Sequence, residues 1–483
     1  MVSASSCGVH YFEMKALVAL FYIVTALCVN TFGNTNIDNN ANVTTVCGTR
    51  MFGRDVNAVR SCMTAYALQH NWYPSPIAGL FSYQTWNGFD GFWQDGAVLE
   101  TLANFMHYAN NSMFKTVVTG SNRDVYSLIE AYYPQPSFDD MAWYGLSYIR
   151  IHELLGSSDD NTSGFIYSAR KIFDWVWENG WDKTHSCAGG IWFDQTQASK
   201  QNVENAQMLQ LSSKLFRHTN DTTLLDKIKL IMKFIEVNGL INETSYMVAD
   251  GVTNNCTNNE VYGPTYNMGL IIGGLVEAAP ILNRTNELIP LAHKVAQATI
   301  AHSTKDGILV EYCFPNCDDD AKMFKGIFLR NLRYLIDYSR ENDPEIWKEN
   351  VEAYVKFIRL NSDTAWTYNR CEPIKDNCTV LYKDGVSLHN TTSGPVFGIE
   401  YSGPFNYTAP IQQTAVLDLF VSGIGVDVKC TGEYCNFDPP VPGPNPLTCQ
   451  DNPCPPDQPC CSYYNEYYTC CESVQKCVNG ECV

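Results

Sequence analysis

Asp139 and Asp140 are neighbouring acids that lie between Pro136 and an apolar segment with helical periodicity. Two carboxyl groups held close together cannot both ionise freely, so one can act as a nucleophile while the other keeps a proton to donate. Retaining cleavage of a glycosidic bond needs these two roles, with carboxyl groups about 5–5.5 Å apart. Adjacent residues where a loop meets a helix could satisfy that spacing, so the pair is a candidate catalytic centre in a sugar-binding cleft.

The same pair has a second interpretation, as the beginning of a helix. Ser137 and Asp139 are good N-cap residues, and acidic side chains are stabilised at the positive end of a helix dipole. Two other acidic runs, at residues 159–160 and 318–320, could begin helices in the same way. The pair alone therefore does not distinguish a cap from a catalytic centre, and the elements around it have to decide.

Helical periodicity dominates the chain from about residue 55 to residue 419. It predicts helices over residues 56–70, 91–109, 140–155, 165–179, 203–218, 223–237, 265–282, 288–302, 321–339, 344–359 and 409–420. Ala142, Leu146 and Ile149 share one face of the helix that follows the acid pair, and Gly156 stands where a C-terminal cap belongs. Strand patterns do not compete with these helices. We therefore predict an all-α fold, an (α/α)6 toroid of six helical hairpins with one helix not recognised, over residues 34–436.

The composition excludes some classes of partner. A net charge of −19 argues against nucleic acid, because phosphate backbones are bound by clustered lysine and arginine. Aromatic residues make up 13% of the chain, and sugar rings present apolar faces that stack on such side chains. Most aromatic rings nevertheless belong to a core.

Residues 1–33 have the pattern of a secretory leader. Lys15 precedes an apolar run from Ala16 to Val29, which is too short for a membrane span but suits a signal peptide, and Met14 is an alternative start. Neither a longer apolar segment nor a lipid-anchor tail follows. We expect a secreted, extracellular protein, or one in the lumen of the secretory pathway, monomeric and without a membrane anchor.

The cysteine count fits an oxidising compartment. The chain has 20 cysteines, and two of them, Cys7 and Cys28, leave with the leader, so an even 18 remain for pairing. Acceptor sequons for N-glycosylation begin at Asn42, Asn110, Asn161, Asn220, Asn242, Asn255, Asn283, Asn377, Asn390 and Asn406. A glycosylated, disulfide-bonded surface is expected.

Six motifs occur in a fixed order along the chain. They are Phe92-Trp93-Gln94-Asp95-Gly96-Ala97, Ser137-Phe138-Asp139-Asp140-Met141-Ala142-Trp143-Tyr144, Cys187-Ala188-Gly189-Gly190-Ile191-Trp192, Lys200-Gln201-Asn202-Val203-Glu204-Asn205, Thr265-Tyr266-Asn267-Met268-Gly269 and Phe324-Lys325-Gly326-Ile327-Phe328-Leu329-Arg330. In this order and spacing, over residues 56–337, they resemble glycoside hydrolase family 76. That family contains the α-1,6-mannanases and fungal cell-wall proteins suspected of transglycosylation.

The resemblance implies an (α/α)6 barrel and endo-acting, retaining cleavage of α-1,6-linked mannan backbones. The family's aspartate pair falls on Asp139, as the nucleophile, and on Asp140, as the general acid/base. A mannan-type polysaccharide, or another N-glycan or cell-wall glycan, is the implied partner. The assignment of the two roles rests on the resemblance and not on the residues themselves.

Further candidate substrate-binding residues lie in or near the motifs. Trp93, Trp143, Trp192 and Tyr266 could line a sugar groove, although an aromatic residue on a helix is commonly part of the core. Asp250 precedes Gly251, where the family carries an Asp-Gly loop, and its alternative is a simple turn.

The fourth motif departs from the pattern Lys-Asn-x-x-Ser-Asn that is usual in the family. Asn205 ends that motif in the usual way, whereas Gln201 and Glu204 are departures, as is Met268 in the fifth motif, where glutamine is common. These changes leave the aspartates in place, so they bear on the sugar-binding subsites and not on the reaction class.

We expect no metal and no cofactor. Cys313, Cys317 and the aspartates at 318–320 could suggest a metal site, but in an oxidising compartment the cysteines are expected to form a disulfide and the aspartates to begin the next helix. Phosphate loops, dinucleotide fingerprints and His-Glu-x-x-His do not occur in the sequence.

The composition changes after Cys435. Residues 437–448 are proline-rich and read as a stiff linker, and residues 449–483 carry eight cysteines, typical of a small disulfide-stabilised module. The spacing Cys460-Cys461 to Cys470-Cys471 weakly resembles half of a granulin module. Four tyrosines at 463–468 could form a sugar- or wall-binding face.

Two classes of function follow. One is a secreted α-1,6-mannan hydrolase, with transglycosylation through the same intermediate as a variant. The other is a non-catalytic glycan-binding or matrix protein that uses the groove and the tail as a lectin. The intact Asp139 and Asp140 favour the enzyme, whereas the altered Gln201, Glu204 and Met268 favour the lectin.

Overall fold

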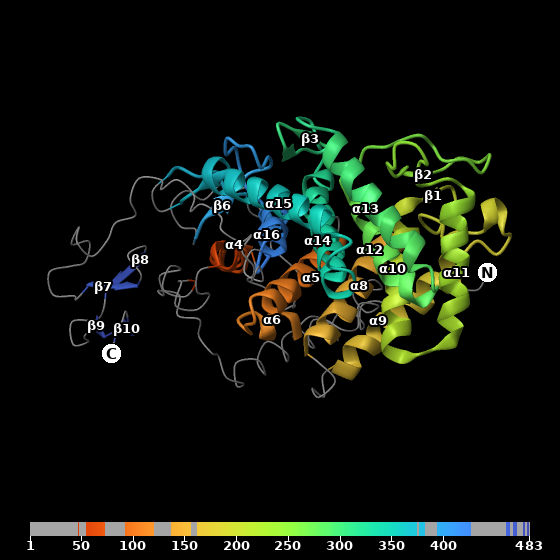
Figure 1. Cartoon of the computed structure of the whole chain (residues 1–483), viewed down its shortest axis with the longest axis horizontal. Coiled ribbons are helices and arrows are strands. Elements are labelled where there is room, and N and C mark those ends of the chain that lie inside the picture. Colours follow the sequence, from red (N-terminus) through yellow and green to blue (C-terminus); the bar gives the residue numbers. More distant parts are fainter. Residues whose placement is uncertain are drawn as a thin grey trace, which may run out of the picture. The chain divides into compact units, whose positions relative to one another are not determined.

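The computed structural model describes residue 47, residues 55–72, 92–119, 137–155, 162–373, 376–381 and 394–426, and four short strands between residues 460 and 482 (Figure 1). The expected leader at 1–33, the acidic run at 159–160, Gly156 and the linker at 437–448 lie outside these described residues.

The described residues of the main body are mostly helical. The α-helices are α4 Val56–Trp72, α5 Phe92–Tyr108, α6 Lys115–Thr119, α8 Phe138–Leu155, α9 Thr162–Gly180, α10 Asn202–Thr219, α11 Thr222–Val237, α12 Thr265–Ile281, α13 Thr285–His302, α14 Ala321–Asn342, α15 Lys348–Tyr368 and α16 Pro410–Ser422.

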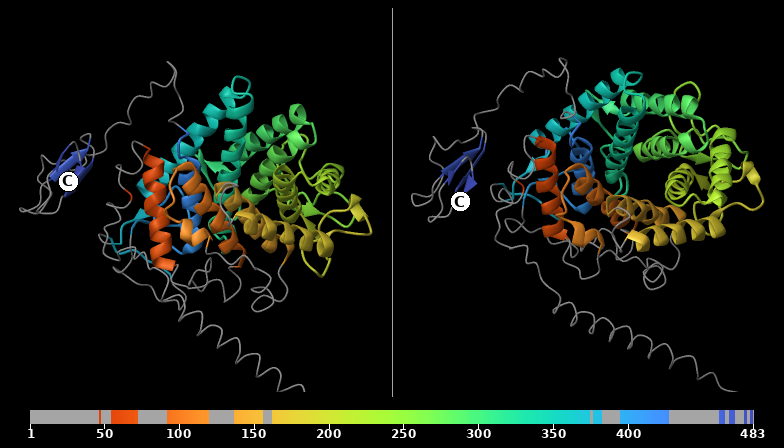
Figure 2. Two further views of the ribbon diagram at one scale, coloured as in Figure 1. Left: turned by 90° about the horizontal axis from the view of Figure 1, so that it is seen from below. Right: turned by 60° about the horizontal axis from the view of Figure 1, so that its bottom comes forward.

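Every second helix of the body belongs to an inner ring. α5, α8, α10, α12, α14 and α16 each contact the next member, and α16 returns to contact α5. α4, α9, α11, α13 and α15 pack on the outside of this ring, so the colours of the sequence run around it in order (Figure 2). The prediction of an all-α (α/α)6 toroid is thereby confirmed.

Burial separates the two layers. All thirteen residues of α16 are buried, as expected of an apolar helix enclosed on every side. The outer helix α11 instead buries a single stripe that includes Leu224, Ile228, Ile231 and Ile235. The inner helices run in the same sense between outer ones, so their N-termini gather at one end of the ring.

The first and last helices close the ring through polar contacts. The Asn57 side chain donates to the carbonyl oxygen of Gly423 at 3.4 Å, and the Asp55 carboxylate accepts from the backbone N–H of Gly425 at 2.6 Å. Gln413 of α16 donates to the carbonyl oxygen of Thr64 at 3.0 Å. Residues at opposite ends of the domain sequence therefore share one buried interface.

Two helices differ from the prediction. The prediction left one helix of the toroid unrecognised without placing it; α6 is the described helix that no predicted range covers, and its five residues are too few to show a period. α15 was predicted over 344–359 but begins at Lys348 and continues to Tyr368. The helix continues past residue 359 with Asn361 and Ser362 buried, and Asn361 accepts a hydrogen bond from the Leu309 N–H at 2.8 Å.

Strands occur only as short pairs among the described residues. In the body these are β1 Lys200–Gln201 with β2 Gly251–Val252, β3 Thr304–Lys305 with β4 Ile308–Leu309, and β5 Arg370–Cys371 with β6 Val396–Phe397. In the cysteine-rich segment they are β7 Cys460–Tyr463 with β8 Tyr467–Cys470, and β9 Cys477–Val478 with β10 Glu481–Cys482. Both pairs in that segment are antiparallel, which the sequence analysis did not predict.

Four disulfides join described cysteines: Cys47–Cys62, Cys187–Cys256, Cys313–Cys317 and Cys371–Cys378. The third confirms the pairing preferred over a metal site. The sequon asparagines at 110, 220, 255, 283, 377 and 406 are exposed and Asn242 is half-buried. Within the described ranges, the search for a helix with the length and apolarity of a membrane span found none.

Candidate active site

The acid pair lies in the first turn of α8, at the end of the ring where the inner helices begin. Asp140 is buried, with 7% of its surface exposed, and Asp139 is half-buried. The start of α8 is joined to the segment around residue 193, because the N–H of Phe138 donates to the carbonyl oxygen of Phe193 at 2.9 Å. A helix N-terminus stabilises negative charge, so this position suits carboxylates that must also lose solvent.

The surroundings of Asp139 raise the pKa of its carboxyl group. Burial raises its pKa from the ordinary range to about 6, and the nearby Asp320 contributes in the same direction. Hydrogen bonds from the Ser137 side chain and from the N–H groups of Asp139 and Asp140 oppose this rise. Asp139 therefore lies in the first turn of a helix and also has a raised pKa, so the two interpretations of the sequence are compatible.

Asp320 is a third acid at this site, and sequence reasoning missed its place there. It is the N-cap residue of α14, and its Oδ1 accepts from Trp93 Nε1 at 2.9 Å and from Gln94 Nε2 at 2.6 Å. Asp318 of the same run behaves as the expected cap, because its Oδ1 accepts from the Ala321 N–H at 2.9 Å. One acidic run thus supplies a helix cap and a residue of the candidate site.

The two tryptophans on the inner helices are mainly buried. Trp93 is 8% exposed and Trp143 is 3% exposed, and their ring centroids are 5.2 Å apart. Phe324 packs against Trp93 at 6.4 Å and against Tyr266 at 4.1 Å. These rings form a continuous aromatic cluster that Trp93 joins to Asp320 through its hydrogen bond, with Tyr266 as its half-buried member.

Asp250 is held beside the start of α12. Its Oδ1 accepts from Asn267 Nδ2 at 2.8 Å, and Asn267 Oδ1 accepts from Asn202 Nδ2 at 3.0 Å. Burial raises the pKa of Tyr266, and Asp250 and Asp139 raise it further, so both acids lie near its hydroxyl. The structure thus brings together Asp139, Asp250 and Tyr266, which are far apart in the sequence.

Trp192 lies in a segment beside the start of α8, and Asn205 is bonded to that segment. Asn205 is fully buried, accepts from the Ile191 N–H at 2.8 Å and donates to the Gln201 carbonyl oxygen at 2.8 Å. Its amide is therefore used to position the segment that carries Trp192. Trp192 is half-buried, and the ammonium of Lys200 lies 4.3 Å from its ring centroid.

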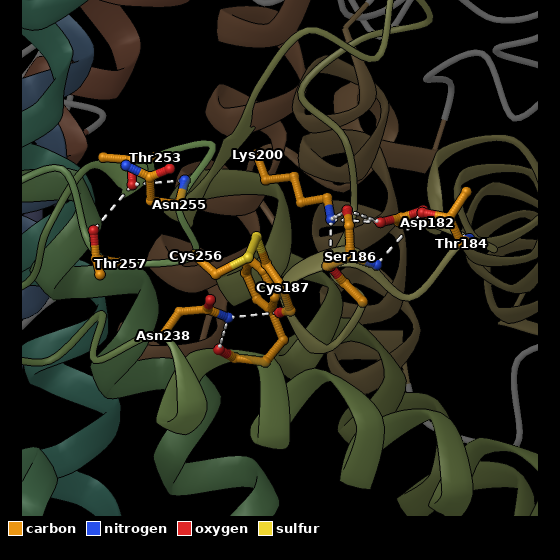
Figure 3. The surroundings of a disulfide bond; sticks show 12 residues. Asp182, Thr184, Ser186, Cys187, Lys200, Asn238, Thr253, Asn255, Cys256 and Thr257 are labelled. Atoms are coloured by element: carbon orange, nitrogen blue, oxygen red, sulfur yellow. Dashed lines mark hydrogen bonds and ion pairs between the residues drawn. A yellow bond between two sulfur atoms is a disulfide. The ribbon is translucent and has the colours of Figure 1, made fainter.

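Lys200 holds the loop before Trp192 in place through an ion pair and hydrogen bonds. Its Nζ lies 2.7 Å from Asp182 Oδ2 and donates to the Ser186 carbonyl oxygen at 2.8 Å (Figure 3). It also donates to the Gly189 carbonyl oxygen at 2.7 Å. The disulfide Cys187–Cys256 joins the same loop to the segment after β2 (Figure 3).

Replacing Lys200 with methionine is expected to lower the free energy of unfolding by about 3 kcal/mol, because Asp182 would remain buried without its cation. Urea denaturation measures this loss. Lys229→Met is the matched control, since Lys229 pairs with Asp226 on the exposed surface and should cost less than about 1 kcal/mol. Equal losses in the two variants would contradict the role given to Lys200.

A cavity of about 550 Å³ lies toward the other end of the inner helices, and its lining includes Tyr108, Arg150, Lys214, Glu277 and Tyr334. Arg150 is on the same helix as the acid pair, about 16 Å further along at 1.5 Å per residue. This cavity is therefore separate from the acids, and the expected cleft at the acid pair stays a prediction.

Relatives of known name match the central part of the chain. The mannan endo-1,6-alpha-mannosidase DFG5 of Saccharomyces cerevisiae is 26% identical over 240 residues, covering 47% of this chain and 52% of the relative. The mannan endo-1,6-alpha-mannosidase DCW1 of Candida albicans is 24% identical over 299 residues, covering 57% and 64%. The chain thus spans about half to two thirds of the length of these curated relatives.

Solved structures share the fold. The α-1,6-mannanase GH76A of Salegentibacter sp. HEL1_6 superposes with a TM-score of 0.61 at 17% identity, covering 77% of this chain and 99% of that one. Dfg5 of Chaetomium thermophilum, in complex with glucosamine, gives a TM-score of 0.61 at 16% identity and covers 78% and 92%. The profile of glycosyl hydrolase family 76 matches residues 55–383, well over half of the sequence. This chain therefore belongs to glycosyl hydrolase family 76.

Proposed function

We propose that this protein is a secreted glycosidase that cleaves α-1,6-linked mannan internally and with retention of configuration. The observation that carries the proposal is the adjacent acid pair in the first turn of α8, in which burial brings the pKa of Asp139 to about 6. Such a pair, inside the part of the chain that the family profile matches, provides a nucleophile and a proton donor together.

In the proposed reaction, the Asp139 carboxylate attacks the anomeric carbon. The bond from that carbon to the glycosidic oxygen breaks, and Asp140 gives its proton to the leaving oxygen. A mannosyl ester on Asp139 results. Asp140, now ionised, removes a proton from water as the water attacks the same carbon, and Asp139 is released as a carboxylate.

The named relatives support mannan as the substrate. An inactive variant of the Salegentibacter α-1,6-mannanase, in which two aspartates with consecutive numbers are replaced by asparagine, is known in complex with α-1,6-mannotriose. In the present chain, we assign contacts with sugar hydroxyls and ring faces to the half-buried Asp250, Tyr266 and Trp192. Three buried residues support these contacts: Trp93, Trp143 and Asn205.

Export from the cell is part of the proposal. Disulfides persist in oxidising compartments, and four are present among the described cysteines. Recovery of the protein from culture medium, with its leader removed, would support secretion. Retention of an uncleaved protein in the cytosol would contradict it.

The direct test incubates the purified protein with α-1,6-mannan and, separately, with α-glucans while reducing ends are measured. Release from mannan alone is expected. Products longer than the starting oligosaccharide would instead show transfer to a sugar acceptor through the same intermediate. A protein that binds mannan without changing it would be the lectin.

Activity is expected to fall on the acid side of about pH 6. Asp139 must be ionised to attack, and below its pKa each pH unit reduces the ionised fraction of the free enzyme about tenfold. A pH profile of kcat/KM on mannan oligosaccharides measures this limb. Constant kcat/KM down to about pH 4 would show that Asp139 does not have the raised pKa that its burial implies.

A further inference from the structure

Glu204 is a fully buried acid in the first turn of α10, at the same end of the ring as the acid pair. Its Oε1 accepts from the Gln201 N–H at 2.5 Å, which completes a capping box, and from Asn205 Nδ2 at 3.2 Å. Its Oε2 is buried and has no hydrogen-bond partner among the described residues. Oε1 therefore stabilises the start of the helix, whereas Oε2 makes no hydrogen bond with the described residues.

The groups that face Glu204 come from three other elements. Burial is the largest cause that raises the pKa of Glu204 well above its ordinary value. Asp139 of α8 and Asp250 of the loop before β2 raise this pKa further. Tyr266 of α12 also interacts with it. The neighbours Asp139 and Asp250 are acids, so ionising Glu204 would add negative charge to an already acidic site.

Asp139 has the complementary need. Its Oδ1 is also buried without a partner in the part of the chain that the structure describes. A buried carboxylate oxygen without a donor is costly, and two carboxylates cannot satisfy each other unless one carries a proton. α8 and α10 contact each other in the inner ring, and Asp139 and Glu204 each lie in the first turn of their helix with one buried oxygen that has no partner among the described residues. A proton on Glu204 would supply the donor that Asp139 lacks.

We propose that Glu204 is a positioning residue that stays protonated and shares its proton with Asp139, so that Asp139 keeps the negative charge needed for attack. This inference rests on the proposed role of Asp139 as the nucleophile. The proton belongs on Glu204 rather than on Asp139 because Asp139 already accepts hydrogen bonds from Ser137 and from backbone N–H groups, whereas Glu204 is the more deeply buried of the two.

Glu204 is also one of the departures of this chain from the family pattern, which usually has serine at that position. The natural comparison is therefore between Glu204→Gln and Glu204→Ser. Glutamine keeps the volume, the capping oxygen and a permanent donor. Serine restores the usual residue but removes the acid and its reach.

The pH below which kcat/KM on α-1,6-mannotetraose falls, the acid limb of the profile, distinguishes a protonated Glu204 from an ionised one. Glu204→Gln should leave the limb at the same pH. Glu204→Ser should move it upward by about one pH unit, a loss of about tenfold at pH 5, because Asp139 loses its donor. Glu243→Gln, an exposed site, is the control and should change nothing. A downward shift in Glu204→Gln would mean that Glu204 is ionised in the free enzyme and would overturn the proposal.

Infrared difference spectroscopy tests the proton without using activity. The spectrum of the wild type minus Glu204→Gln at neutral pH should contain the carbonyl stretch of a protonated carboxyl group. Absence of that band would overturn the proposal even if mannan is cleaved. Presence of the band in a protein that does not cleave mannan would overturn the proposed function and leave the proton on Glu204 in place.

Discussion

Asp139→Asn is expected to lower kcat/KM on α-1,6-mannan by about 10⁴-fold or more, because the amide cannot form the covalent intermediate. Asp140→Asn should cost about 10²–10⁴-fold, the usual contribution of general acid–base catalysis. Both variants should remain folded, since asparagine has the size of aspartate and a neutral side chain is easier to bury. Initial rates of reducing-end release measure the losses.

The thermal stability of Asp139→Asn should not fall with its activity. Because the pKa of Asp139 is raised by burial, its ionised form is a cost to the folded state that grows as the pH rises above the unfolded value, about 4, and is complete above about pH 6. Asp139→Asn removes this cost, so its Tm at pH 8 should equal or exceed that of the wild type. Asp226→Asn, an exposed acid, is the control for both measurements. Full activity in either Asp139→Asn or Asp140→Asn would place the chemistry elsewhere.

Arg330→Met should cause the largest loss of stability, about 5 kcal/mol of unfolding free energy. The guanidinium is 2% exposed and pairs with Glu100 of α5 at 2.7 Å and with Asp418 of α16 at 2.8 Å. It also donates to the Ala97 carbonyl oxygen at 3.0 Å. Breaking one buried ion pair typically costs about 3–5 kcal/mol, and this substitution leaves two carboxylates buried without their cation. Three neighbouring helices of the inner ring lose their shared contact.

Urea denaturation of Arg330→Met and of Arg284→Met separates this effect from the loss of any arginine. Arg284 pairs with Glu236 and Glu287 on the surface, and its replacement should cost less than about 1 kcal/mol. The cost of Arg330→Met should shrink toward pH 5, because burial raises the pKa of Asp418 to about 6 even beside Arg330 and a protonated acid needs no cation. Similar losses for both arginines would contradict a role of Arg330 in holding the ring together.

The local parts of the fold could be predicted from sequence because they depend on neighbouring residues. The spacing of Ala142, Leu146 and Ile149 predicts α8, and the pairing of Cys313 with Cys317 follows from their separation of four positions and an oxidising compartment. The alternation of helices then leads to the toroid. α15 was placed wrongly because the burial of Asn361 depends on a contact with residue 309, which no local pattern contains.

Which residues share the candidate site is decided by the closure of the helical ring, and local sequence patterns do not contain this information. Asp139 and Asp140 were found because two acids side by side are visible in the sequence. Asp320 was recognised only as part of a helix cap, since its bond to Trp93 joins residues more than two hundred positions apart. Glu204 was noted as a departure from the family pattern, but its proximity to Asp139 appears only when α8 and α10 become neighbours in the ring.

Proton NMR of the first product released from α-1,6-mannotetraose by the wild-type protein tests the account most directly. The proposed mechanism requires the two carboxyl groups to lie about 5–5.5 Å apart, a spacing that leaves no room for a directly attacking water, so cleavage should proceed through Asp139 with net retention. The account predicts that the new reducing end appears first as the α-anomer and only later equilibrates. A β-anomer formed first would mean direct attack by water and would contradict the roles given to Asp139 and Asp140.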